Sequence, residues 1–120
     1  MKKIYIAGPF RGPDAWAITL NIHNAKLMIP IIGKAGHVPV CPHSMYGDFD
    51  GTLPDVYWLE ATMNLLEVCD AVYLCENWRQ SEGSKAEAAR AEELGIPVFE
   101  LLDDLLNWMS HQKSLEQEPR

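Results

Sequence analysis

Short apolar runs alternate along the chain with longer stretches in which apolar residues recur at helical spacing. Each short run is rich in β-branched or aromatic residues and is bounded by glycine, proline or polar turn residues, which predicts a β-strand. The longer stretches predict amphipathic helices, because their apolar positions fall on one face of a 3.6-residue period. The predicted strands are residues 3–7, 37–40, 71–75 and 98–101, and the predicted helices are residues 15–34, 55–68, 83–95 and 102–109.

Three features qualify this alternation. Residues 43–54 contain glycines, aspartates and a proline without periodicity, which predicts a long loop of functional character. Pro30 lies inside the first helical stretch and should kink it or tighten its last turns, because proline has no N–H to donate. From His111 onward the sequence turns polar, which predicts a frayed tail.

Strands that alternate with helices are typical of an α/β protein whose parallel sheet carries helices on both faces. The run at 71–75 is largely apolar, which predicts a central strand buried on both sides. We therefore predict a three-layer α/β/α fold, Rossmann-like or flavodoxin-like, with a parallel sheet of four to five strands in the order 2-1-3-4(-5). Residues 1–110 would form one domain, and residues 111–120 a flexible polar tail.

Composition narrows the functional classes. The formal net charge of -7 argues against a nucleic-acid duplex or an anionic membrane as partner, since both require a basic face, although a few local donors can still bind a small anion. Cys41, Cys69 and Cys75 lack CxxC or metal-site spacing, which predicts buried reduced thiols and no metal site. The chain starts directly into a strand and has no apolar run of bilayer length, so we expect a cytoplasmic protein.

Loops leave the carboxyl ends of the first three predicted strands, at residues 8–13, 43–54 and 76–84. Open α/β folds bind ligands in a crevice at this edge, so side chains of the three loops should converge there. Arg11 stands between Gly8 and Gly12, where its guanidinium would suit a phosphate or carboxylate, although a solvated surface arginine is an equal alternative. His43 is the one histidine in these loops and is a second candidate.

The segment after the third strand carries most of the candidate chemistry. Gly83 and Ser84 stand where a helix begins, and they either cap that helix or offer N–H groups to an anionic or hydroxylated ligand. Glu87 follows about one turn inside the helix, where the positive helix end should keep its carboxylate ionised by about 0.3–1 kcal/mol. Trp78 could stack on a base or sugar, or simply pack at the rim.

Several motifs together resemble the nucleoside 2-deoxyribosyltransferase superfamily, which includes the 2'-deoxynucleoside 5'-monophosphate N-glycosidases. The similarity covers most of residues 3–101. It is carried by IYIAGPFRG, GHVPVCPHS, LLEVCDAVYL, and S-x-G-x-x-x-E followed by A-x-x-x-G-I-P.

The resemblance implies a role at each matching position. Glu87 stands at the position of the nucleophile that attacks the anomeric carbon, Tyr5 at that of the first-strand tyrosine, and Arg11 and Ser81 at those of phosphate-contacting residues. It therefore implies cleavage, by hydrolysis or transfer, of the N-glycosidic bond of a (deoxy)nucleoside 5'-monophosphate or nucleoside, without a cofactor. The predicted site comprises catalytic Glu87, Tyr5 and His43 and substrate-binding or phosphate-binding Gly8, Arg11, Ser81, Gly83, Ser84 and Trp78.

One position departs from the family pattern. The family has an aspartate for proton handling where this chain has Thr62, and threonine does not titrate near neutral pH. His43 or Asp55 could take over that role. Alternatively, the chain is a non-catalytic nucleotide-binding or sensing domain that retains the pocket.

The resemblance also implies an oligomer. Relatives are dimers or larger, with sites near the subunit interface, so we expect a homodimer or higher homo-oligomer that binds a small nucleoside or nucleotide. Trp58 and Trp108 would suit such a subunit surface.

Overall fold

In the computed structural model, which describes residues 1–117, the strands form one parallel sheet in the predicted order β2-β1-β3-β4. Tyr5 at the centre of β1 pairs with Val40 of β2 on one side and with Val72 of β3 on the other. No fifth strand occurs within residues 1–117. The strands are β1 (Lys3–Ala7), β2 (Val38–Val40), β3 (Ala71–Leu74) and β4 (Val98–Phe99).

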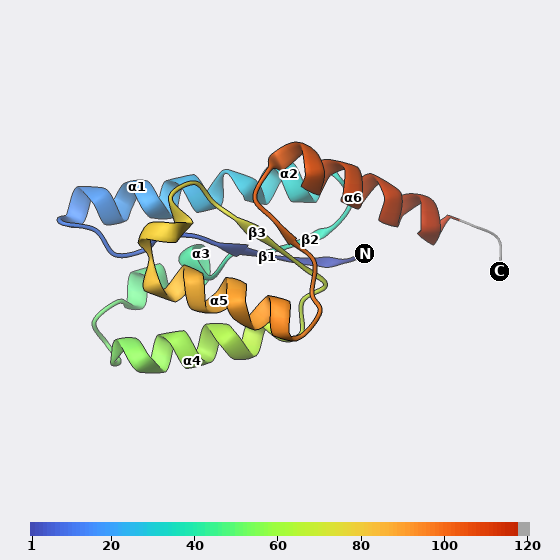
Figure 1. The fold of residues 1–120 in the computed structure, drawn as a ribbon. Helices are drawn as coiled ribbons and strands as arrows, with labels where there is room; N and C mark the ends of the chain where they lie inside the picture. The colour runs from blue at the N-terminus through green and yellow to red at the C-terminus, as the bar shows by residue number, and fades with distance from the viewer. Residues whose placement is uncertain (118–120) are drawn as a thin grey trace.

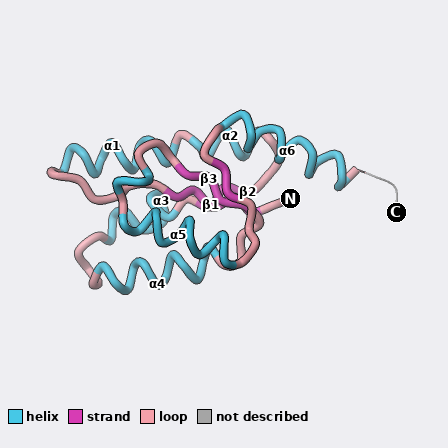
Figure 2. The backbone as a smooth tube through the Cα atoms, viewed as in Figure 1, coloured by secondary structure: helices cyan, strands magenta, loops and turns pink. Residues whose placement is uncertain are grey.

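Helices cover both faces of the sheet, which confirms the three-layer α/β/α architecture. Figure 1 shows α1, α2 and α6 on one side and α4 and α5 on the other, and Figure 2 shows the magenta strands between these two layers. The helices are α1 (Ala15–Lys26), α2 (Met28–Lys34), α3 (Pro42–Tyr46), α4 (Asp55–Leu66), α5 (Glu82–Glu93) and α6 (Leu102–Glu116), with short 3-10 turns η1 (Gly47–Phe49) and η2 (Trp78–Gln80).

Alternation along β1 divides the core into two clusters, because successive strand residues point to opposite faces. Ile4 and Ile6 pack with α1, α2 and α6, whereas Tyr5 and Ala7 pack with α4 and α5. The first cluster contains Ala25, Met28, Ile32, Leu105 and Met109, and the second contains Leu66, Val72, Leu74, Ala88 and Ala91. The small Ala88 and Ala91 of α5 therefore lie against the sheet, and the neighbouring Glu87 reaches the Tyr5 hydroxyl of β1.

One local prediction is confirmed and two are corrected. The predicted effect of Pro30 is confirmed, because the helix expected over 15–34 is interrupted at Leu27. Pro30 lies in the first turn of α2 and has no N–H to donate to the carbonyl of Lys26. Residues 43–54 are not a plain loop, since they contain most of α3 and all of η1. Finally, α6 continues to Glu116, so the frayed tail predicted from His111 is wrong for residues 111–116, while residues 118–120 lie outside the described part.

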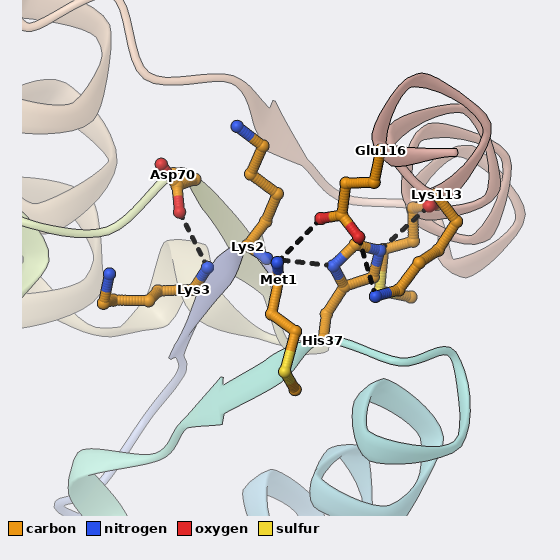
Figure 3. Close-up of polar contacts among 8 residues, drawn as sticks. Met1, Lys2, Lys3, His37, Asp70, Lys113 and Glu116 are labelled. Atoms are coloured by element: carbon orange, nitrogen blue, oxygen red, sulfur yellow. Dashed lines mark hydrogen bonds and ion pairs between the residues drawn. The ribbon is translucent and has the colours of Figure 1, made fainter. Parts of the chain in front are cut away.

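The extra length of α6 is held by the amino terminus (Figure 3). The Met1 ammonium lies 2.7 Å from a carboxylate oxygen of Glu116. Nearby, the buried His37 accepts a hydrogen bond at Nδ1 from the Lys2 N–H and donates from Nε2 to the Met109 carbonyl, at 3.1 and 2.9 Å. His37 is thus a packing residue, and the contacts of Met1 and Lys113 with Glu116 hold the last turn of α6.

Two further observations concern the chain as a whole. Among the described residues, no helix combines the length and apolar character needed to cross a membrane. Cys41, Cys69 and Cys75 are buried free thiols, as predicted. Burial raises the pKa of Cys75 to about 12 and that of Cys69 to about 11, so both thiols stay protonated and unreactive near neutral pH.

Candidate active site

The loops at the carboxyl edge of the sheet enclose a cavity of about 590 Å³. One wall comes from the loop after β1 and from α3, and the other from α4 and the first turns of α5. Cavities of this size accommodate ligands as large as a nucleoside or nucleotide. Its principal lining residues are Tyr5, Gly8, Phe10, Arg11, His43, Tyr46, Asp50, Asp55, Trp58, Thr62, Ser81, Gly83, Ser84 and Glu87.

A hydrogen-bonded pair, Tyr5 and Glu87, forms the inner end of the site. Tyr5 comes from the central strand and Glu87 from the second turn of α5, and the tyrosine hydroxyl donates to Glu87 Oε2. Both side chains are deeply buried, with 1% of Tyr5 and 8% of Glu87 exposed. Ser81 sets the start of α5, because its Oγ accepts the Ser84 N–H at 3.1 Å as an N-cap. The cap is therefore Ser81 rather than the Gly83-Ser84 pair.

Burial, and not the helix end, controls the ionisation of Glu87. Desolvation raises the pKa of this carboxyl from 4.5 to about 7, although the Tyr5 hydrogen bond acts in the opposite direction. This displacement corresponds to roughly 3 kcal/mol against the charged form, whereas a helix end supplies only about 0.3–1 kcal/mol in its favour. The expectation that the helix keeps Glu87 ionised is therefore wrong. The pKa of Tyr5 is raised as well, by its burial and then by the adjacent Glu87.

His43 lies in the cavity wall, as predicted, with its ring edge-to-face on Phe10 at 5.8 Å between centroids. Its Nε2 donates to the Pro9 carbonyl at 2.9 Å, which leaves Nδ1 as an acceptor in the neutral ring. Burial lowers the pKa of His43, so the neutral form prevails. Because a neutral Nδ1 accepts protons, His43 is no ready acid for a leaving group.

Unpaired polar atoms gather in this cavity. Within residues 1–117, the buried side-chain polar atoms without a hydrogen-bond partner are His43 Nδ1, Trp58 Nε1 and Ser84 Oγ, and all three residues line the cavity. An unpaired buried polar group costs about 1–3 kcal/mol. A ligand with matching donors and acceptors would remove that cost, which makes the cavity a candidate binding site.

Arg11 lines the cavity, but its guanidinium is already paired. Nη1 donates to Asp50 Oδ2 at 2.8 Å, and Nη2 lies 2.6 Å from Asp50 Oδ1 and 2.5 Å from Asp55 Oδ1. Asp55 is 74% exposed and bound to Arg11, so it does not take the place of a buried acid beside Glu87. The sequence placed Arg11 in this crevice correctly but offered no signal for its two partners.

Of the two roles considered for Trp78, the structure supports packing and not a place in the cavity. Trp78 lies outside the cavity, where its Nε1 donates to Glu100 Oε1 at 3.1 Å and Arg79 covers its ring at 4.5 Å. Instead, Trp58 lines the cavity in contact with Tyr46 at 5.4 Å between ring centroids. Trp58 and Thr62 stand four residues apart on α4, and this helical spacing was the signal that could have placed both on the cavity face.

Trp58 and Trp108, which were expected to suit a subunit surface, both pack within the chain. Trp58 is half-buried in the cavity wall, and Trp108 is half-buried against Phe99 at 5.8 Å between ring centroids. The homo-oligomer stays a prediction, but these two tryptophans no longer support it.

Thr62 lies in the cavity wall on α4, at the position where the deoxyribosyltransferase pattern has an aspartate. Its hydroxyl donates to the Leu59 carbonyl at 3.1 Å. Among the described lining residues, the carboxyl groups are Asp50, Asp55, Glu82 and Glu87. Of these, Glu87 is the buried one, so the inner end of the cavity holds one carboxyl group.

Residues 2–101 match the family described as "Domain of unknown function (DUF7768)". The matched range contains every residue that lines the cavity. No curated protein matches the chain.

Proposed function

The chain belongs to the DUF7768 family of domains of unknown function, and from its cavity we propose that it cleaves the N-glycosidic bond of a nucleoside or nucleoside 5'-monophosphate. The observation that carries this proposal is the Tyr5–Glu87 pair at the inner end of a cavity of nucleoside size. The unpaired atoms of His43, Trp58 and Ser84 support it, since a nucleoside offers many hydrogen-bonding groups. The motif resemblance to deoxyribosyltransferases points in the same direction.

Glu87 is the nucleophile in this mechanism. Its ionised carboxylate forms a bond to C1' while the C1'–N bond breaks and the bonding electron pair leaves with the base. The departing base takes a proton from water. Water, or a second base, then attacks C1' of the glycosyl ester and restores the carboxylate, and the proton that the attacking group loses neutralises the hydroxide left by the first step. The Tyr5 hydroxyl donates to Oε2 and so orients the carboxylate toward the sugar.

The raised pKa of Glu87, about 7, determines the pH dependence. Because the nucleophile must be ionised, the rate should rise with pH through about 7 and level off above it. A general acid at this position would give the opposite slope. Thr62 does not titrate in this range and neutral His43 accepts rather than donates, so neither should add a falling limb near neutral pH.

The test is to incubate the protein with a panel of nucleosides and their 5'-monophosphates and to measure the released free base by chromatography. Glu87→Ala should lower the rate about 10³-fold, equivalent to about 4 kcal/mol. Glu92→Gln, which removes an exposed carboxylate of the same helix, should retain wild-type activity. Full cleavage by Glu87→Ala on every active substrate would refute the assignment.

A second candidate is a nucleotide-binding or sensing domain that does not cleave its ligand. Thr62 favours it, because the inner cavity then lacks a second acid. Tight ligand binding measured by calorimetry, without any free base after long incubation, would select this candidate. For either function we place the protein in the cytoplasm, where its three free thiols would stay reduced.

A further inference from the structure

We infer that Asp50 and Asp55 determine specificity: they hold Arg11 in ion pairs at the cavity rim and so select a ligand whose sugar carries no phosphate. The inference rests on the proposed function for the identity of the ligand as a nucleoside. It differs from the simplest expectation for a guanidinium in a binding cavity, which is phosphate recognition.

Arg11, Asp50 and Asp55 form a cluster of ion pairs at the cavity rim. Arg11 lies in the loop after β1, Asp50 follows η1, and Asp55 begins α4, so the three side chains join three separate segments at the rim. The contacts of 2.8 and 2.6 Å to Asp50 and 2.5 Å to Asp55 occupy both terminal nitrogens of the guanidinium. A phosphate at Nη2 would have to displace a carboxylate, and one that approached the remaining N–H groups of the guanidinium would lie beside both carboxylates.

The charged side chains at the rim carry a net negative charge. Among the described residues that line the cavity, Arg11 is the one lysine or arginine, and the lining also contains the carboxylates of Asp50, Asp55 and Glu82. These four groups sum to a negative charge, which repels a phosphate dianion that enters beside them. Glu82 is partly balanced by Lys85 at 2.7 Å, but Lys85 does not line the cavity.

The first turn of α5 is the other place where the cavity could hold an anion. There the Ser84 N–H already donates to Ser81 Oγ at 3.1 Å. Glu82 adds a negative charge to the same turn. The cap and the Glu82 charge therefore weaken this turn as an anion site, which favours a neutral sugar hydroxyl over a phosphate here.

Two roles are conceivable for Asp50 and Asp55, and they predict opposite changes in the binding of a phosphorylated ligand when the two aspartates are removed. If Asp50 and Asp55 oriented Arg11 for a phosphate, their removal would weaken the phosphorylated ligand. If they mask Arg11, their removal frees the guanidinium and strengthens that ligand.

The experiment compares wild type with the Asp50→Asn/Asp55→Asn double variant on a nucleoside and its 5'-monophosphate. The measured quantity is the ratio of kcat/KM for the monophosphate to kcat/KM for the nucleoside. This ratio should rise about tenfold or more in the double variant, because two repulsive charges are lost and one cation is freed. Asp48→Asn is the matched control, since Asp48 is exposed in η1 and does not line the cavity, and its ratio should equal that of wild type.

Binding in the Glu87→Gln background gives a second readout that needs no turnover. Calorimetric Kd values for the same two ligands should show the same change in ratio. If the double variant does not fold, the Asp50→Asn single variant carries the test with a smaller rise, because Asp50 contacts both guanidinium nitrogens.

The outcomes separate the two proposals. Base release by wild type with an unchanged or lowered ratio in the double variant would overturn the inference alone. A raised binding ratio without base release from any substrate would overturn the proposed cleavage alone and support the inference. Failure of all variants to bind either ligand would overturn both.

Discussion

Replacement of Glu87 by glutamine should stabilise the fold at alkaline pH. The folded state holds the Glu87 proton with a pKa of about 7, whereas the unfolded chain releases it near the ordinary value of 4.5. Between these values the folded state binds more protons than the unfolded state, so the free energy of unfolding falls as pH rises from about 4.5 to about 7. The full loss, reached above this window, is roughly 3 kcal/mol. Glutamine retains the shape of the side chain and avoids this loss.

The assay is urea unfolding of wild type and Glu87→Gln near pH 4 and near pH 8. The stability difference should be small at the acidic value and should grow by roughly 3 kcal/mol in favour of the variant at the alkaline value. Glu92→Gln serves as control, because that exposed side chain stays in water in both states and should give no pH-dependent difference. A wild-type-to-Glu87→Gln difference that is constant across this range would refute the reasoning that burial controls Glu87.

Three further predictions follow from single contacts. Tyr5→Phe removes the hydroxyl that lowers the pKa of Glu87, so the midpoint of a carboxyl NMR titration of Glu87, and of any cleavage activity, should move to higher pH. Ser81→Ala removes the side-chain cap of α5 and should lower the free energy of unfolding by about 1 kcal/mol in urea titrations. Gly8→Ala would place a Cβ 2.8 Å from Cys75 Cβ, and the resulting shift of the loop after β1 should cost about 1–3 kcal/mol in the same assay.

Much of the fold followed from local patterns. Turn residues bound each strand, and the strand-helix alternation gave the parallel sheet in its observed order. Gly95, at a φ of 71°, lies just after α5 where the sequence predicted a stop. The three loops meet as predicted for the same reason, because parallel strands end at one edge and bring Arg11, His43 and Glu87 to one cavity.

Other features depended on partners far away in the chain. Residues 111–116 are helical in contact with the amino terminus, and Trp58 rather than Trp78 faces the cavity because α4 packs opposite α3 there. Such contacts leave little periodic signal in the sequence.

Sequence alone determined that Glu87 stands near the start of a helix at the carboxyl edge of the sheet, because helix and strand signals are local. Only the tertiary structure decided its chemical state, since desolvation arises from β1 and from the other residues that pack around the carboxyl group. It likewise decided that Arg11 is paired, because Asp50 and Asp55 lie 39 and 44 positions away along the chain. Burial and charge pairing are properties of the assembled cavity, and no single segment of the sequence contains them.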